Sequence, residues 1–270
     1  MKITFIGGGN MASAFIGGLI RQGCDASLMH VVEIIPELRA QLTQRFGVAV
    51  FADAEQLPVA DDVVVLAVKP QQMRNAAMSL APRLRQELVL SIAAGIRIAE
   101  LSHWLGGYER IVRCMPNTPA LIGAGITAAY AAPGVAPGGR TSAEKILAAV
   151  GGVIWVETEA MLDAVTAVSG SGPAYVFYFI EALRDAAREL GLPAGAANTL
   201  AIETFLGAAK LAAQSSDDVA ALRARVTSRG GTTESALASM AADEISQRIL
   251  KAVRAAERRS RELGAEFGKD

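Results

Sequence analysis

The 270-residue chain has little of what metal sites and disulfide frameworks are made from. It contains two cysteines, Cys24 and Cys114, and two histidines, His30 and His103. Two cysteines are too few for a cysteine-rich zinc site or for a fold stapled by disulfides. Two histidines likewise argue against a histidine-based metal site, so we expect no metal centre.

An excess of charge of either sign is also missing, and aromatic residues are scarce. Lysine and arginine total 26, aspartate and glutamate total 27, the formal net charge is -1, and 5% of residues are aromatic. Nucleic acids and anionic membranes are bound through basic surfaces, so we expect neither as a partner. The longest uncharged stretches, near 120–139 and 164–180, carry glycine, proline and serine, which argues against a membrane-spanning helix. We expect a soluble, cytoplasmic protein.

Apolar residues are plentiful and make up 51% of the chain, which excludes a disordered protein. As far as Val156, short apolar runs alternate with amphipathic stretches, as in parallel strands covered by helices on both faces. This alternation predicts an α/β domain, with a Rossmann-like doubly wound sheet, over residues 1–158. The expected strands are Ile3–Ile6, Leu28–Val32, Val63–Val68, Leu88–Ile92, Arg110–Met115 and Val153–Val156, and the expected helices are Met11–Arg21, Pro36–Phe46, Gln71–Leu84 and Thr141–Val150.

Beyond residue 158 no strand pattern is found, and residues 159–270 are expected to form an all-α domain. Gly191-Leu192-Pro193 breaks one long helix, and Asp217 or Asp218 can cap a later one. The expected helices are Met161–Val168, Pro173–Leu190, Ala194–Gln214, a helix ending at Arg225, Thr232–Met240 and Asp243–Leu263.

The segment from Gly7 to Ala12, Gly-Gly-Gly-Asn-Met-Ala, follows the first strand and opens the first helix. It fits the dinucleotide fingerprint, because Gly7 permits the tight turn, Gly9 lets the backbone approach a pyrophosphate, and Ala12 keeps helix and strand close. Free amides at the helix start, with Asn10 and Met11, would face the phosphates. The alternative is a glycine-rich turn without a ligand. The strand–helix alternation that follows favours a nicotinamide-dinucleotide site.

Glu33 follows the second strand, 21 residues after Ala12. A carboxylate there can accept hydrogen bonds from the ribose hydroxyls of NADH and would repel the extra phosphate of NADPH. Ile34 stands where an arginine could have bound that phosphate. The alternative is a solvated capping carboxylate before Pro36. We expect NADPH or NADH as the cofactor, with NADH preferred.

Small residues and one lysine follow the later strands, at the edge where open sheets bind ligands. They include Ala67-Val68-Lys69-Pro70 and, after the next two strands, Ala93 and Asn117. Lys69 could lie over the cofactor ribose or phosphates, although a solvated turn lysine is the simpler interpretation of that residue. Asn117 could bond the nicotinamide ribose or amide. Cys114 resembles a buried strand residue more than a nucleophile, because no neighbouring histidine or lysine would activate it.

Two segments of the helical half join glycine and hydroxyl residues ahead of a helix. They are residues 169–174, Ser-Gly-Ser-Gly-Pro-Ala, and residues 226–233, Val-Thr-Ser-Arg-Gly-Gly-Thr-Thr. Backbone amides at such helix N-termini suit a small carboxylate. Each segment is also explained by ordinary capping. In a chain that binds a dinucleotide, the pair favours a substrate site.

These motifs, in this order, resemble those of the pyrroline-5-carboxylate reductase family over essentially the whole chain. The resemblance implies a Rossmann domain followed by an all-α dimerisation domain that intertwines with a second subunit, with the substrate site at the dimer interface. Members commonly form homodimers and often rings of five dimers, a decamer. The implied activity is reduction of 1-pyrroline-5-carboxylate to L-proline by hydride transfer from NAD(P)H, the last step of proline biosynthesis.

Carried over by position, the resemblance makes Thr233 and Ser228 the candidate catalytic residues, with Thr233 bonded to the ring nitrogen. A protonated imine is already electrophilic, so a strong general acid is not required. Arg229 replaces the proline of many members, and Ala54 replaces an asparagine that often contacts the adenosine. The expected substrate-binding residues are Ser228, Gly230, Gly231, Thr232 and Thr233, and the expected cofactor-binding residues are Gly7, Gly9, Asn10, Met11, Ala12, Glu33, Ala67, Val68, Lys69, Pro70, Ala93 and Asn117.

Two other functions compete with a reductase. A hydroxyacid dehydrogenase of similar build needs a lysine as acid or base on the long helix, and Tyr175–Ile180 contains none. A non-catalytic dinucleotide sensor that binds a partner protein would have no evident need of the loop Ser228–Thr233. Mixing the protein with NADH and the imine substrate separates the three.

Overall fold

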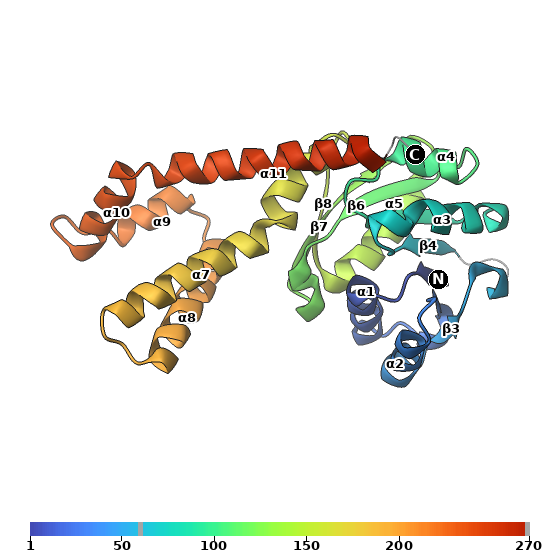
Figure 1. The fold of residues 1–270 in the computed structure, drawn as a ribbon, viewed down its shortest axis with the longest axis horizontal. Coiled ribbons are helices and arrows are strands. Elements are labelled where there is room, and N and C mark those ends of the chain that lie inside the picture. The colour runs from blue at the N-terminus through green and yellow to red at the C-terminus, as the bar shows by residue number, and fades with distance from the viewer. Residues whose placement is uncertain (59–61, 268–270) are drawn as a thin grey trace. The chain divides into compact units, whose positions relative to one another are not determined.

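The computed structural model describes residues 1–58 and 62–267 (Figure 1). Contacts divide the chain into two compact units, one formed by Met1–Ser171 with the chain from Ala256 onward, the other by Gly172–Ala255. The predicted boundary after residue 158 lies just beyond the last strand, which ends at Trp155, and the compact units divide 13 residues later. The reason is that helix α6 (Met161–Val165) packs on the sheet.

The first unit is built on one sheet, with eight strands in the described residues. The order is β3-β2-β1-β4-β5-β6-β7-β8, in which only the β6–β7 pairing is antiparallel. The chain begins in the middle of the sheet and builds outward on both sides, so the predicted doubly wound fold is confirmed. The strands are β1 (Ile3–Ile6), β2 (Met29–Val32), β3 (Ala49–Phe51), β4 (Val63–Leu66), β5 (Leu88–Ser91), β6 (Ile111–Met115), β7 (Gly125–Ala131) and β8 (Gly151–Trp155).

Helices cover both faces of this sheet, which explains why β1, β4 and β5 are apolar except for the buried Thr4 and Ser91 (Figure 1). Successive strand residues point to opposite faces. Phe5 and Val65 therefore join one core cluster, and Ile6 and Leu66 join the other. The first cluster includes buried residues of α1 (Asn10–Arg21), α2 (Pro36–Phe46) and α5 (Pro137–Leu147), and the second those of α3 (Pro70–Leu80) and α4 (Ile98–Trp104).

Two strands and one α-helix of this unit were not predicted: β3, β7 and α4. β3 has three residues and α4 has seven, too few for either to produce a clear periodic pattern. β7 consists largely of alanine, glycine and threonine, and alanine and glycine have little intrinsic preference for strands. It is held by its neighbours, antiparallel to β6 and parallel to β8, rather than by its own composition.

The segment Ser169–Gly172 leads into a long helix, as the sequence suggested, but the turn before that helix is π-helical. Residues Thr166–Gly170 form a π-helical turn directly after α6, and Ser171 keeps helical backbone angles before α7 (Gly172–Glu189) begins. The Ser171 N–H donates to the Thr166 carbonyl oxygen at 2.8 Å, the spacing of a π turn. Its amide therefore already has a partner. Of the amides in this segment, that of Ser171 is therefore not available to a carboxylate.

The second unit is all-helical, as predicted, and leaves much apolar surface uncovered. Helices α7 and α8 (Ala194–Gln214) pack side by side (Figure 1), yet α7 has no buried residue and α8 buries only Ala197 and Ala201. An apolar helical surface of this kind is typical of a protein–protein interface. The exposed large apolar residues of these two helices are Val176, Phe177, Tyr178, Leu183, Leu200, Ile202, Leu206 and Leu211.

Three more helices complete the chain: α9 (Val219–Arg225), α10 (Thr232–Ala242) and α11 (Ile245–Phe267). α11 begins in the second unit and ends in the first, with the change at Ala256. Among the described helices, none combines the length and the apolar character needed to cross a bilayer.

Candidate functional site

The glycine turn after β1 lies directly against the segment after β4. Gly7 has a φ of 99°, and its N–H donates to the Val32 carbonyl oxygen at 2.8 Å. A Cβ on Gly7 would come within 2.9 Å of the Ala67 carbonyl carbon and oxygen and of Val68 Cγ1. Only glycine fits this turn, because other residues rarely adopt a positive φ and because a Cβ would clash with Ala67 and Val68. The structure thus brings together two motifs that are 60 residues apart.

The start of α1 offers unoccupied backbone donors beside open space. Gly9 is the N-terminal capping residue, and no side chain caps the helix. The N–H groups of Asn10, Met11 and Ala12 have no acceptor among the described residues. A Cβ on Gly9 would meet nothing within 4 Å. Amides at a helix start with room above them fit a pyrophosphate, so the residues present suit the expected dinucleotide.

Glu33, at the end of β2, is 7% exposed and bound to the glycine turn. Its Oε2 accepts from the Gly8 N–H at 2.8 Å, and its Oε1 accepts from the Ile35 N–H at 2.9 Å. It is therefore not the solvated capping carboxylate of the alternative interpretation. Arg39 Nη1 donates to the Glu33 carbonyl oxygen at 2.7 Å, which places a cation beside the same strand end. Sequence reasoning missed Arg39 because a helical arginine six residues further on gives no local signal.

A groove of about 250 Å³ adjoins the glycine turn and runs between α1 and α2. Gly8, Gly9 and Asn10 line one part of it, and Arg21 and Arg45 line another. The start of α1 is therefore open to a ligand rather than covered by α2.

The other predicted cofactor residues lie at the same carboxyl edge of the sheet. Ala67 and Val68 are half-buried after β4, exposed Lys69 caps α3, and Pro70 is the first residue of that helix. Ala93, after β5, is 5% exposed and can offer a ligand little besides its backbone. The carboxyl ends of parallel strands meet at one edge of the sheet, and open α/β sheets bind their ligands at that edge.

The side chain of Asn117, after β6, is already engaged by the protein. Its Oδ1 accepts from the Ile126 N–H at 3.0 Å, and its Nδ2 donates to the Ser169 carbonyl oxygen at 3.2 Å. It ties the start of β7 to the π turn. The second N–H of this amide has no acceptor among the described residues.

Cys114 lies inside β6 and is 1% exposed, whereas Cys24 is exposed. Burial raises the pKa of the Cys114 thiol far above its ordinary value, with Arg113 opposing the change. We therefore expect a thiol-alkylating reagent at neutral pH to modify one thiol of the folded protein and two after denaturation. Mass spectrometry of the two samples checks this. Rapid modification of Cys114 in the folded protein would contradict its burial.

In the second unit, the loop before α10 has the form expected of a small anion site. The Gly231 N–H donates to the Ser228 carbonyl oxygen at 3.0 Å, and Gly230 has a φ of 73°. No side chain caps α10, and the N–H groups of Thr232 and Thr233 have no acceptor among the described residues. These two amides are available to a carboxylate.

One acidic residue near this loop, Glu234, was not singled out in the sequence. Glu234 Oε2 accepts from the Gly230 N–H at 2.6 Å, so that amide already has an anionic partner within the chain. The available signal was an acidic residue in the first turn of a helix, which is the usual place for charge complementing the helix dipole. Of the five residues predicted to bind the substrate, Gly230 and Gly231 therefore have amides that are already occupied within the chain.

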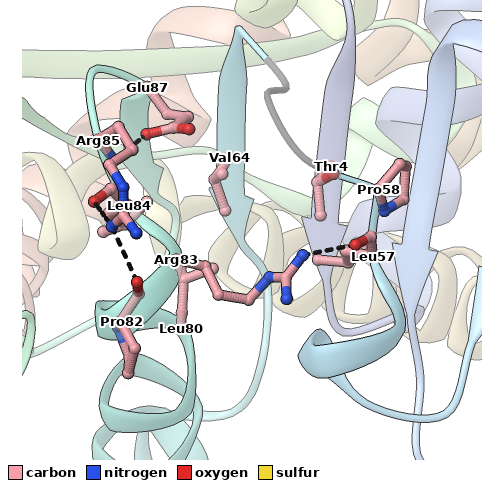
Figure 2. A pocket seen from close by; sticks show the side chains of 10 residues that line it. All are labelled: Thr4, Leu57, Pro58, Val64, Leu80, Pro82, Arg83, Leu84, Arg85 and Glu87. Atoms are coloured by element: carbon pink, nitrogen blue, oxygen red, sulfur yellow. Dashed lines mark hydrogen bonds between the residues drawn. The ribbon is translucent and has the colours of Figure 1, made fainter.

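A second cavity, of about 180 Å³, lies at the opposite edge of the sheet (Figure 2). Its lining residues come from the starts of β1 and β4, the adjacent Leu57 and Pro58, the end of α3 and the turn before β5. Arg83 reaches across it and donates to the carbonyl oxygens of Glu55 and Leu57. Arg85 donates from its guanidinium to the Pro82 carbonyl oxygen and from its backbone N–H to the Glu87 carboxylate (Figure 2). The guanidinium groups of both arginines are thus hydrogen-bonded to nearby backbone carbonyl oxygens. The cavity shares no lining residue with the groove at the glycine turn.

Comparison with known proteins identifies the family. A family model described as pyrroline-5-carboxylate reductase dimerisation matches residues 159–263, and one described as NADP oxidoreductase coenzyme F420-dependent matches residues 2–95. A pyrroline-5-carboxylate reductase of Pseudomonas aeruginosa is 45% identical over 268 residues, covering 99% of this chain and 98% of that protein. This chain belongs to the pyrroline-5-carboxylate reductase family.

Solved structures of the family share the fold along the whole chain. A pyrroline-5-carboxylate reductase of Coxiella burnetii is 41% identical with a TM-score of 0.92, over 97% of this chain and 98% of that one. The pyrroline carboxylate reductase of Plasmodium falciparum, solved with NADP bound, is 28% identical with a TM-score of 0.87, over 98% of both chains. The predicted family and fold are confirmed.

Proposed function

We propose that this chain is a pyrroline-5-carboxylate reductase, an NAD(P)H-dependent oxidoreductase acting on a C–N bond, which reduces 1-pyrroline-5-carboxylate to L-proline. The observation that carries the proposal is the match to reductases over nearly the full length of both chains. Production of proline is the last step of its biosynthesis, for which we propose a cytoplasmic location. The assay is direct: the purified protein is mixed with NADH and the imine, and loss of the reduced cofactor is followed.

The first unit supplies the proposed dinucleotide site. The free amides of Asn10, Met11 and Ala12 would hold the pyrophosphate, with Gly9 leaving room for it. The segment Ala67–Pro70 and the backbone at Ala93 would line the site at the ends of β4 and β5. A reduced nicotinamide bound there supplies the hydride.

The loop Ser228–Thr233 supplies the proposed substrate site. Backbone amides of Thr232 and Thr233 would hold the carboxylate, with the exposed Ser228 hydroxyl as a further donor. The Thr233 hydroxyl would bond the ring nitrogen and orient it. Because the protonated imine is already electrophilic, the side chain needs only to position that nitrogen, and no strong acid is required beside it.

We propose NADH as the preferred cofactor, on the basis of Glu33. Its carboxylate is held at the glycine turn by the Gly8 and Ile35 amides, so its charge stays where a 2′-phosphate would approach. Catalytic efficiency with NADH should exceed that with NADPH about tenfold, which corresponds to about 1.4 kcal/mol of repulsion. Arg39 lies near enough to offset part of this charge, which is why we expect dual use rather than exclusion of NADPH.

Steady-state kinetics of a charge-neutral variant test this preference. Glu33→Gln should lower the NADH-to-NADPH ratio of kcat/KM. Glu109→Gln is the matched control, because Glu109 is exposed and precedes β6 at the other edge of the sheet. A native enzyme that is much more efficient with NADPH would refute the preference.

We propose that a second copy of the chain covers the apolar surface of α7 and α8, giving a homodimer, and that dimers assemble further into a decamer. The family model for dimerisation spans these helices, and their exposed apolar side chains support the proposal. Light scattering during size-exclusion chromatography distinguishes a monomer, a dimer and a decamer.

A further inference from the structure

The last turns of α11 pack on the segment that joins β5 to α4. Gly95, in the middle of this segment, is buried and has a φ of 80°. A Cβ placed on it would lie 3.2 Å from the ring of Phe267 and 3.4 Å from Leu263 Cβ. From the other side, a Cβ on Gly264 would lie 3.2 Å from Arg97 Nε and 3.4 Å from the Gly95 carbonyl oxygen. Helix and segment are therefore in close contact through two glycines.

A buried polar contact and a half-buried one hold this arrangement. Ser260 of α11 donates its hydroxyl to Asp163 Oδ1 of α6 at 2.7 Å, and the two residues are 4% and 5% exposed. Buried carboxylates require such a donor, so this contact specifies how α11 lies on α6. Glu159 Oε1, just before α6, accepts from the Ile98 N–H at 2.8 Å and from Arg113 Nη1 at 2.9 Å. The hydrogen bond from Ile98 thus holds the segment after β5 at the point where α4 begins.

This segment begins at Ala93, beside the end of β5. In the sheet order, β5 is separated from β1 by β4. A dinucleotide whose pyrophosphate lies on the start of α1 spans the carboxyl edge of the sheet, with one half on the β2 side and the other toward β4 and β5. Since Glu33 follows β2, the adenosine half belongs to that side. The nicotinamide half is the one that meets the segment after β5.

We propose that the end of α11 positions the Ala93–Arg97 segment for the nicotinamide half of the cofactor, with Gly264 as the positioning residue. The inference rests on the proposed dinucleotide site. Gly264 touches no ligand in this account, because it acts through Gly95 and Arg97. A side chain at position 264 displaces the segment and leaves the glycine turn after β1 untouched.

The decisive experiment compares two ligands on Gly264→Val, with Ala265→Val as the control. Ala265 is the next residue of α11 and is exposed, so both variants place valine in the same helical turn. Titration calorimetry measures binding of NADH and of ADP-ribose, which lacks the nicotinamide. For Gly264→Val, the Kd for NADH should rise about fivefold or more while that for ADP-ribose changes less than about twofold. The control should change neither.

Gly264→Ala keeps the proposal testable if the valine variant does not fold. Alanine favours a helix over glycine, so helix propensity predicts an unchanged or higher Tm. The added Cβ still meets Arg97 and Gly95 at 3.2–3.4 Å, so NADH binding should weaken while ADP-ribose binding does not. The KM for the imine should be unchanged and kcat should fall, because only the nicotinamide half is misplaced.

The outcomes separate this inference from the proposed function. Equal weakening of both ligands would mean general damage and would overturn the positioning role, as would unchanged NADH binding in both Gly264 variants. If the native protein binds no nicotinamide dinucleotide, the proposed cofactor site fails, and this inference fails with it. If the native protein binds NADH tightly and the Gly264 variants bind it equally well, the positioning role is overturned and the proposed cofactor site still stands.

Discussion

Replacing Gly9 with valine is expected to weaken NADH binding about 100-fold or more while the protein still folds. Gly9 has a φ of -69° and a ψ of -170°, angles that any residue adopts, and a Cβ there meets no protein atom within 4 Å. Valine is a poor N-terminal cap, so we expect a Tm lower by about 2–4 °C, the effect of about 1 kcal/mol. Its side chain would occupy the space in which phosphate oxygens approach the α1 amides, which is the physical reason for the lost affinity.

Gly7→Ala provides the matched contrast two residues earlier in the same turn. Its φ of 99° is strained for alanine, and the new Cβ would lie 2.9 Å from the backbone of Ala67. This variant should lose stability, whereas Gly9→Val should lose the ligand. Calorimetric titration and thermal unfolding of both variants measure the two effects. Normal NADH affinity in a folded Gly9→Val protein would show that the pyrophosphate does not lie on α1.

Replacing Thr233 with alanine is expected to lower kcat about 10- to 100-fold, with the Kd for NADH changed less than about twofold. The lost hydroxyl would orient the ring nitrogen, and a hydrogen bond to a charged group is worth about 1.5–3 kcal/mol. Thr233 lies in the first turn of α10, in the unit that does not contain the glycine turn. Cofactor binding should therefore be spared.

Two further variants control for the loss of side-chain atoms. Thr232→Ala removes the same atoms from the preceding, exposed residue, whose expected contribution is its backbone amide, so kcat should stay within about threefold of the native value. Thr233→Ser keeps the hydroxyl and should recover most of the turnover. Equal losses in Thr232→Ala and Thr233→Ala would refute a specific role for the Thr233 hydroxyl, as would unchanged kinetics in both.

How much of the fold was predictable depended on how locally each element is specified. β1 and β4 are buried on both faces, so every residue of each is apolar or, at Thr4, small, and their sequences identify them. β7 is different, since its small residues form a strand only because β6 and β8 flank it. The π turn at Thr166–Gly170 was also missed, because one extra residue in a helical turn hardly changes the apolar periodicity.

The candidate site shows the same division between local and distant determinants. The glycine turn was predictable because its chemistry is carried by adjacent residues. The partners of Asn117 were not, since they lie 9 and 52 residues away along the chain. Glu234 could be placed in the first turn of α10 from the sequence, but its bond to the Gly230 amide depends on the conformation of the loop. Packing of Gly264 against Gly95 joins residues too far apart for any local pattern to reveal it.

The central claim is that this chain transfers hydride from a reduced nicotinamide to 1-pyrroline-5-carboxylate. The most direct test incubates the purified full-length protein with the imine and NADH, follows the loss of reduced-cofactor absorbance, and identifies the amino acid formed by chiral chromatography. The account predicts L-proline in equal amount to the NADH consumed, with slower consumption of NADPH. Binding of the dinucleotide without consumption of either cofactor, or consumption without proline, would contradict it.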